Sequence, residues 1–209
     1  EKYKTKTPSL HVARYWAMCE WFDQTCGQLL DFLDREKLTD NTIVLFVVDN
    51  GWIQSPNSPA SERSKLTPYD GGVRSPIMVR WPGHMKPGRS ESLAQSIDFV
   101  PTVLAALGEK PSPEMQGINL LDPEAVAKRT FVTGGCFTHN AVDLDDPSKN
   151  VQFRWIVEGT WKLIQPVAKD EPAQLYDLAA DPDEHRDLSA DQHDRIEALR
   201  KRLDAWWKP

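Results

Sequence analysis

Thr42-Ile43-Val44-Leu45-Phe46-Val47-Val48, which runs directly into Asp49-Asn50-Gly51, is the segment from which the fold class of this chain is predicted. The run is apolar and rich in β-branched residues, with almost no alternation between apolar and polar positions. A strand with this pattern is expected to be buried on both faces in a parallel sheet. We therefore predict a strand over residues 42–48, with Asp49 and Asn50 at its carboxyl end.

A long amphipathic helix is predicted before this strand, from His11 to about Lys37. Its apolar side chains recur at steps of three and four residues, which is the helical period. They are Val12, Trp16, Cys19, Phe22, Cys26, Leu29 and Leu33. Thr39-Asp40-Asn41 ends the helix, so helix and strand together indicate an α/β unit.

The residues after the strand continue the alternation of helices and strands. Residues 52–72 are rich in Ser, Pro, Asn and Gly and predict a long loop. A second short strand is predicted over residues 76–81. A helix is predicted over residues 97–107, with Asp98 as its N-cap and Gly108 at its end. The predicted fold class of this region is α/β.

The pattern changes after about residue 125. Short strand candidates at residues 130–134, 151–158, 161–165 and 174–176 predict a small antiparallel sheet. A final helix follows, for which Ser189 and Gln192 match a capping box. Its apolar stripe contains Ile196, Leu199, Leu203 and Trp206. We therefore predict two parts, an α/β domain over residues 1–125 and a small α+β subdomain over residues 126–209.

The composition argues against several classes of protein. The chain has 209 residues and a formal net charge of -6, which argues against a general nucleic-acid binder because such proteins need a basic face for phosphates. No apolar run reaches the roughly 18 residues of a membrane span. Cys19, Cys26 and Cys136 form no Cys-x-x-Cys pair, and we interpret them as buried structural thiols.

Asp49-Asn50-Gly51 allows two interpretations on its own. The side-chain oxygens of Asp49 and Asn50 suit Ca²⁺ or Mg²⁺, and ligands gather at the carboxyl ends of strands in open α/β sheets. Ca²⁺ takes about six to eight oxygen ligands, so further carboxylates must come from elsewhere. The alternative is a tight turn, because Asp, Asn and Gly tolerate left-handed backbone.

Four separated motifs, in the same order, resemble the sulfatase family of the alkaline-phosphatase superfamily. The most extended is Ser64-Lys65-Leu66-Thr67-Pro68-Tyr69-Asp70-Gly71-Gly72-Val73-Arg74-Ser75-Pro76, followed by Ile77-Met78-Val79-Arg80-Trp81-Pro82-Gly83. The others are Asp40-Asn41-Thr42-Ile43-Val44 leading into Asp49-Asn50-Gly51, Ile97-Asp98 with Pro101-Thr102, and Leu175-Tyr176-Asp177-Leu178 followed by Asp181-Pro182. The resemblance covers about Leu10 to Trp207. It implies the C-terminal portion of a sulfatase, with part of the α/β sandwich domain followed by a small antiparallel sheet with a helix.

The resemblance implies roles for residues that match these motifs. Asp49 and Asn50 correspond to two ligands of the active-site cation, usually Ca²⁺, with Mg²⁺ as the alternative. Lys65 corresponds to the lysine that binds the sulfate group and neutralises charge in the transition state. Asp70 and Arg74 are expected to be structural.

Two further residues are candidates for the substrate pocket. Trp52 directly follows the metal motif and could border the substrate through its flat apolar face. His139 lies in the segment that leads to the second subdomain and could enter the pocket. The alternative for His139 is an ordinary surface residue.

The resemblance also implies groups that this chain lacks. Sulfatases use a formylglycine made from a cysteine or serine in a Cys/Ser-x-Pro/Ala-x-Arg motif, and none of the three cysteines has that surrounding sequence. The family's paired N-terminal aspartates are absent too, as are a lysine and a histidine of the sulfate pocket. We expect these groups in a missing N-terminal half, as a separate chain or a further segment. The chain alone is therefore expected to be inactive.

The implied function is hydrolysis of a sulfate ester, with a sulfated glycan as the substrate class and an exported, periplasmic or lysosomal location. A phosphate or phosphonate ester hydrolase or a sulfamidase of the same superfamily is the first alternative, because a cation and a lysine suit any tetrahedral oxyanion. The second alternative is a non-catalytic remnant that keeps the fold without the chemistry.

Overall fold

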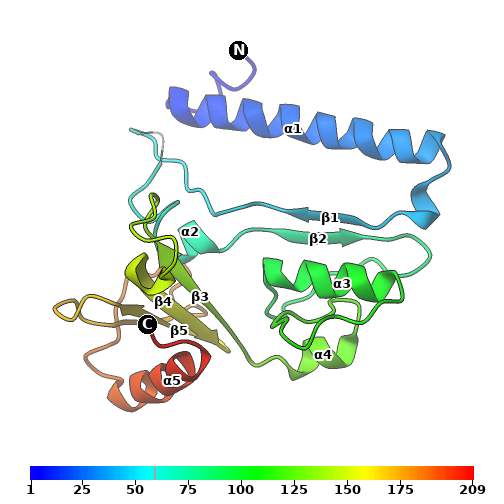
Figure 1. The fold of residues 1–209 in the computed structure, drawn as a ribbon. Coiled ribbons are helices and arrows are strands. Elements are labelled where there is room, and N and C mark those ends of the chain that lie inside the picture. Colours follow the sequence, from blue (N-terminus) through cyan, green and yellow to red (C-terminus); the bar gives the residue numbers. More distant parts are fainter. Residues whose placement is uncertain (59) are drawn as a thin grey trace.

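A computed structural model of the chain describes residues 1–58 and 60–209 (Figure 1). Helix α1 spans Leu10–Arg35 and begins at Ser9, whose hydroxyl accepts a hydrogen bond from the Val12 amide. This confirms the predicted long helix. The short 3₁₀ helix Thr39–Asn41 then leads the chain into the first strand.

Strand β1 spans Val44–Val47 and pairs with β2, Ile77–Arg80, so both predicted strands are present. The two run antiparallel, with Val44 opposite Arg80. Val47 is 37% exposed. The expectation of a strand buried on both faces in a parallel sheet is therefore wrong for β1 as it stands in this chain. An unbroken apolar run indicates that both faces need cover, but it does not specify the direction of the neighbouring strand.

The segment between β1 and β2 is a loop that ends in the short helix α2, Asp70–Val73. In Figure 1, α1 runs along the β1 side of the strand pair and α3, Phe99–Ala106, runs along the β2 side. A further short helix, α4, spans Pro123–Lys128. Helices α1 and α3 therefore flank a strand pair, as the α/β prediction requires.

Asp98 directly precedes α3 as its N-cap residue, as predicted, but the expectation that its side chain caps the helix is wrong. The Asp98 side chain makes no capping bond to α3. It is buried, forms an ion pair with Arg129 and accepts hydrogen bonds from the Gln95 and Ile118 amides. The carboxylate is already used by a guanidinium and two amides from other segments, so it is not available to the helix.

The second half of the chain forms a four-stranded antiparallel sheet in the order β3-β4-β5-β6, which confirms the prediction. Its strands span Phe131–Phe137, Val151–Glu158, Trp161–Pro166 and Gln174–Asp177. Helix α5, His193–Trp206, packs against this sheet. The core between them consists of Ile156, Leu163, Leu175, Ile196, Leu199 and Leu203.

The predicted capping box of α5 is also wrong. Gln192 precedes the helix but makes no side-chain capping bond. Ser189 donates its amide to Asp187, whose carboxylate also accepts the Leu175 amide of β6. The segment before α5 is therefore bound to the edge of the sheet, and the helix starts only after it.

The apolar stripe of α1 is largely uncovered. Among the described residues of this helix only Ala13 and Leu33 are buried, and Trp16, Phe22 and Leu29 are exposed. The cysteines follow the same pattern, because Cys19 is exposed and the other two are only partly buried. The expectation of buried thiols is thus wrong, since the face of α1 that should bury two of them lacks a covering partner here.

Candidate functional site

Asp49 and Asn50 follow β1 directly, as the sequence predicts. Asp49 is exposed and Asn50 is half-buried. The Asn50 amide nitrogen donates to the Gly51 carbonyl at 2.9 Å, which leaves the side-chain oxygen of Asn50 available as a ligand. Both residues thus offer oxygens of the type that Ca²⁺ or Mg²⁺ binds.

These two oxygen donors fit part of a cation site and not all of it. No cluster of three or more His, Cys, Asp or Glu side chains that could hold a metal ion occurs in residues 1–58 and 60–209. Because Ca²⁺ takes about six to eight oxygens, Asp49 and Asn50 suffice only if further ligands are added. The donor set therefore matches an incomplete site.

The backbone after Asn50 is fixed by Gly51. Its amide donates to the Gly72 carbonyl at 2.7 Å. A Cβ atom on Gly51 would lie only 2.4 Å from the Gly71 carbonyl oxygen. Glycine is therefore required at Gly51 because two backbone segments approach closely. The tripeptide thus joins β1 to the segment that contains α2.

Lys65 is exposed and lies in a turn that starts at Ser64. The Ser64 side chain is buried; its hydroxyl accepts the Ile53 amide at 2.8 Å, and its carbonyl accepts the Thr67 hydroxyl at 2.7 Å. Leu66 has the left-handed φ of 70°, which is strained for a residue with a Cβ. The turn therefore holds Lys65 at its tip on a backbone that is anchored on both sides.

Two hydrogen bonds join the two predicted parts of the site. The Gly51 amide donates to the Gly72 carbonyl, and the Ile53 amide donates to the hydroxyl of Ser64, the residue before Lys65. Trp52 lies between Gly51 and Ile53, is 40% exposed, and donates its indole N–H to Gln54 at 3.3 Å. Asp49-Asn50-Gly51 (the metal motif), Trp52 and residues 63–70 around Lys65 (the lysine loop) thus belong to one connected unit.

His139 is placed differently. It is exposed and follows β3 in the second sheet. Within the described residues, no hydrogen bond or ion pair joins it to the unit that contains Asp49 and Lys65. A role for His139 in the pocket stays a prediction.

Sequence reasoning missed the side chains that hold the lysine loop. Asp70 has the expected structural role, and its partners are Lys162 on β5 and Glu184. Lys162 is fully buried although it stands in a short strand between apolar neighbours. A lysine inside a strand pattern normally indicates a solvent-facing position, so the sequence carried no signal for this cluster.

Cys136 lacks the properties of a nucleophile. Burial raises the pKa of its thiol from the ordinary 9.0 to about 11. The thiol therefore stays protonated at neutral pH, whereas reactive cysteines have lowered pKa values. This agrees with the absence of a formylglycine motif around it.

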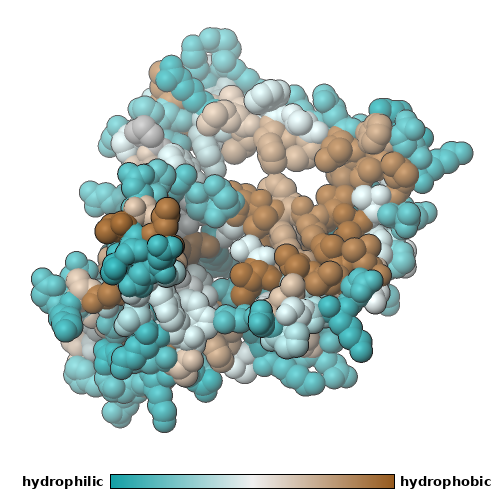
Figure 2. All heavy atoms as spheres, viewed as in Figure 1, coloured by the Kyte–Doolittle hydropathy of each residue, from teal (hydrophilic) through white to brown (hydrophobic). Residues whose placement is uncertain are grey.

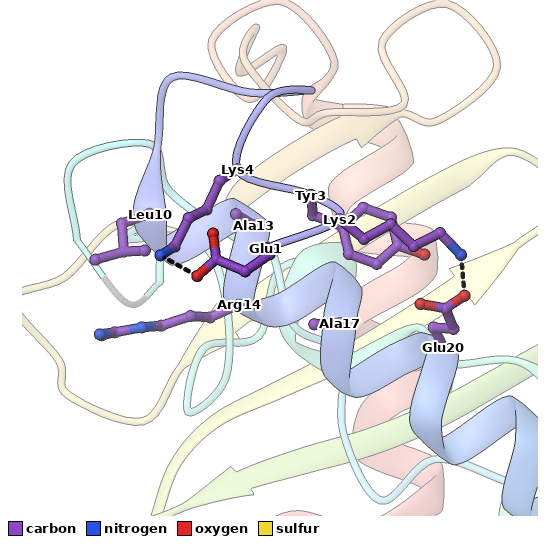
Figure 3. Close-up of a pocket in the computed structure, with 9 residues that line it drawn as sticks. All are labelled: Glu1, Lys2, Tyr3, Lys4, Leu10, Ala13, Arg14, Ala17 and Glu20. Carbon is purple, nitrogen blue, oxygen red and sulfur yellow. Dashed lines mark hydrogen bonds and ion pairs between the residues drawn. The ribbon is translucent and has the colours of Figure 1, made fainter.

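A hollow of about 430 Å³ lies elsewhere, between the first residues of the chain and the start of α1 (Figure 3). Its walls carry the ion pairs Lys4–Glu1 and Lys2–Glu20. None of the predicted site residues lines it. Mixed charges that already pair with one another leave little for an anionic ligand, so the candidate site remains the unit around Asp49 and Lys65.

Two family models match the sequence, and together they cover almost the whole chain. The model described as Sulfatase matches residues 1–109, and the model described as N-sulphoglucosamine sulphohydrolase, C-terminal, matches residues 64–207. The second description agrees with the predicted C-terminal portion.

Individual relatives give the same picture. The chain is 30% identical to an N-acetylgalactosamine-6-O-sulfatase of Bacteroides thetaiotaomicron over 88% of this chain and 40% of that protein. It spans about two fifths of the length of this and a second curated relative. No helix in the described parts combines the length and apolar character needed to cross a bilayer.

Solved structures confirm the fold class. A protein in complex with its substrate D-glucosamine-2-N,6-O-disulfate superposes with a TM-score of 0.66 and 23% identity over 88% of this chain and 37% of that one. A phosphonate monoester hydrolase of Agrobacterium radiobacter has a TM-score of 0.74 and 22% identity over 92% of this chain and 40% of that one. At these identities the likeness concerns the fold alone.

Proposed function

Because this chain belongs to the sulfatase family of the alkaline-phosphatase superfamily, we propose that it carries one part of the active site of a sulfuric ester hydrolase. The observation that supports this is the connection of the metal motif to the lysine loop through the Gly51–Gly72 and Ile53–Ser64 hydrogen bonds. A cation ligand pair and an anion-binding lysine on one anchored unit suit a sulfate group. Residues 1–125 would then belong to the large catalytic domain and residues 126–209 to the small C-terminal subdomain.

Asp49 and Asn50 supply two oxygen ligands to a divalent cation, Ca²⁺ or Mg²⁺. The cation, when bound, adds positive charge next to the sulfate oxygens. Asp49 gives a charged carboxylate oxygen and Asn50 a neutral amide oxygen, held in place because Gly51 fixes the backbone behind them. The remaining ligands come from outside this chain.

Lys65 binds the sulfate group. Its exposed position at the tip of an anchored turn allows the ammonium to reach an oxyanion without moving the backbone. A fixed positive charge stabilises the negative charge that develops in the transition state. Trp52 and His139 are the candidate pocket residues, with Trp52 in the same connected unit as Lys65.

The nucleophile, a formylglycine, belongs to the part of the sulfatase that this chain does not contain, and the chain alone is inactive. That part docks on an apolar face made by α1, the β1–β2 pair and α3, where brown spheres gather in Figure 2. The exposed apolar side chains of these elements include Trp16, Met18, Trp21, Phe22, Leu29, Met78 and Val100, and Leu107 directly after α3. Apolar patches of this extent mark protein contacts.

A sulfated sugar is the substrate class that the relatives support. One curated relative is named as an N-acetylgalactosamine-6-O-sulfatase, and one structural neighbour was solved with a disulfated glucosamine. The sulfate ester of such a sugar presents the tetrahedral anion that Lys65 and the cation require. Hydrolysis of a phosphate or phosphonate ester and a non-catalytic remnant are the competing outcomes of the test below, and turnover of an N-sulfated sugar in place of either ester would identify the sulfamidase alternative.

The test compares aryl sulfate and aryl phosphate hydrolysis by the intact enzyme that includes this chain, by this chain alone, and by the Lys65→Ala variant. We expect sulfate turnover by the intact enzyme only, its loss on chelation, and its recovery with Ca²⁺. Preferred phosphate turnover would replace the sulfatase assignment by the phosphatase alternative. No turnover of either ester by the intact protein would support the remnant.

A further inference from the structure

Lys162 is a buried cation that the proposed chemistry does not use. Its side chain has no exposed surface, and its ammonium nitrogen lies 2.7 Å from Asp70 Oδ1 and 2.8 Å from Glu184 Oε1. Glu184 Oε2 in turn accepts the Asp70 backbone amide at 2.6 Å. The ammonium thus pairs with both carboxylates, and Glu184 also binds the backbone amide of Asp70, the first residue of α2. We call these three residues the Lys162 cluster.

The Lys162 cluster connects two parts of the protein. Asp70 opens α2, at the end of the loop that carries Lys65, whereas Lys162 lies on β5 of the C-terminal sheet. Glu184 follows β6 and has a left-handed φ of 57° although it is 1% exposed. A strained, buried residue persists only where its surroundings fix it. The C-terminal subdomain therefore holds the end of the lysine loop through buried charges.

The other end of the same loop is held by the same subdomain. The Arg63 guanidinium donates to the Glu184 carbonyl and stacks over the Tyr69 ring, with 4.4 Å from its central carbon to the ring centroid. The Tyr69 hydroxyl donates to Gln174 on β6 at 2.9 Å. Residues 63–70, with Lys65 between the two attachments, are thus fixed at both ends.

Stability alone does not require this arrangement. A buried ion pair loses hydration on folding, and apolar residues of similar volume often give equal or greater stability at the same position. What charged partners add is a defined geometry, because each ammonium and carboxylate must meet its partner at hydrogen-bond distance. The loop so fixed is the one whose Ser64 hydroxyl also binds the segment after Asp49 and Asn50.

We propose that Lys162, with Asp70 and Glu184, is a positioning group through which the C-terminal subdomain sets the place of Lys65 relative to Asp49 and Asn50. The inference rests on the proposed function of Lys65. It makes the C-terminal sheet part of the catalytic apparatus, although the Lys162 and Glu184 side chains are buried.

The test uses the Lys162→Met variant of the intact enzyme, with Arg154→Met as the matched control. Arg154 is also a buried cation of the C-terminal sheet, with Nη1 2.9 Å from Asp204 Oδ1, but its partners lie on and after α5. Both variants remove one buried charge from the same subdomain. Only Lys162→Met removes a contact to the lysine loop.

Two measurements are made on each variant. Hydrogen exchange of the amides in residues 63–72 reports the order of the loop, and kcat and KM for an aryl sulfate report catalysis. For Lys162→Met we expect loop exchange at least about tenfold faster. We also expect kcat to fall by about tenfold or more, with a smaller change in KM, because misplacing a group that acts in the transition state lowers kcat. Arg154→Met should leave loop exchange unchanged.

Equal loop exchange in Lys162→Met and the wild type, or equal effects of both variants on the loop, would overturn the inference. If Lys162→Met does not fold, Glu184→Gln, which keeps the shape and an acceptor for Asp70, is compared instead. If both Lys162→Met and Glu184→Gln fail to fold while Arg154→Met folds, the Lys162 cluster is purely structural. That result would also overturn the inference. A wild-type enzyme without any ester hydrolysis would refute the proposed function, while loop exchange would still decide the positioning role.

Discussion

Asp98 and Arg129 form a buried, two-bond ion pair: Arg129 Nη2 donates to Asp98 Oδ1 at 2.7 Å, and Nη1 donates to Oδ2 at 2.5 Å. Asp98 precedes α3 and Arg129 follows α4, so the pair closes the segment between the two helices. The Thr102 hydroxyl binds the Asp98 carbonyl and accepts the Leu120 amide, which fastens the same segment a second time. The ion pair and the Thr102 hydrogen bonds together fix the chain just before it enters the C-terminal sheet.

The Arg129→Met variant should lower the free energy of unfolding by about 3–5 kcal/mol, because it leaves the fully buried Asp98 carboxylate without its cation. Lys128→Met is the control, since Lys128 pairs with Glu124 on the surface and exposed pairs contribute little. Urea unfolding of both variants measures the difference. A loss below about 1 kcal/mol for Arg129→Met would mean that water reaches the carboxylate and replaces the guanidinium.

The Lys65→Ala variant should reduce kcat/KM for a sulfate ester in the intact enzyme by about 10²–10³-fold, as expected when a group that stabilises transition-state charge is removed. Unfolding should be unaffected, because Lys65 is exposed. Lys86→Ala removes another exposed lysine, from a different loop, and should retain full activity. Equal activities of the two variants would exclude Lys65 from the sulfate site.

How far the sequence predicts this molecule depends on the range of the interactions. Periodicity predicted α1 and the strands of the C-terminal sheet because each depends mainly on its own residues and the core they face. Asp98 was assigned to the nearest helix end, whereas its partner Arg129 lies 31 positions away. Local pattern cannot reveal such a partner.

The candidate site shows the same limit. Asp49, Asn50 and Lys65 were predicted through motifs, because those residues lie in short stretches with fixed spacing. Lys162 escaped detection because its partners come from α2 and from the segment after β6. Likewise, the apolar run of β1 correctly predicted a strand, but the direction of its neighbour depends on the topology of a sheet.

The Gly51→Ala variant should be destabilised by about 1–3 kcal/mol, because its Cβ would overlap the Gly71 carbonyl and neither backbone can yield without strain. The displacement should also reduce activity, since Asp49 and Asn50 immediately precede this contact. Gly88→Ala is the control, as nothing lies within 4 Å of a Cβ built there. Thermal unfolding measures the midpoint of both variants, and only Gly51→Ala should have a lowered midpoint. An unchanged midpoint for Gly51→Ala would contradict the close approach.

The free energy of unfolding should fall as the pH rises from about 9 to about 11, because Cys136 is buried. Its folded pKa is raised to about 11 from 9.0 because burial disfavours the thiolate. The raised pKa stabilises the folded state below about pH 9, and this contribution is lost as pH rises through 11. The difference in unfolding free energy between the wild type and Cys136→Ala should therefore shrink over this range. A constant difference would indicate an unshifted thiol.

The apolar face should govern assembly with the rest of the sulfatase. Trp21 on α1 is 73% exposed, and Leu107 directly after α3 is 71% exposed. A Trp21→Glu, Leu107→Glu double variant should bind a separately produced N-terminal half at least about tenfold more weakly, because charges would be buried in an apolar contact. Leu144→Glu is the control: Leu144 is 88% exposed in a loop after β3, outside the face. Calorimetric titration measures both affinities. If the double variant binds as tightly as Leu144→Glu, the missing half must dock on another surface.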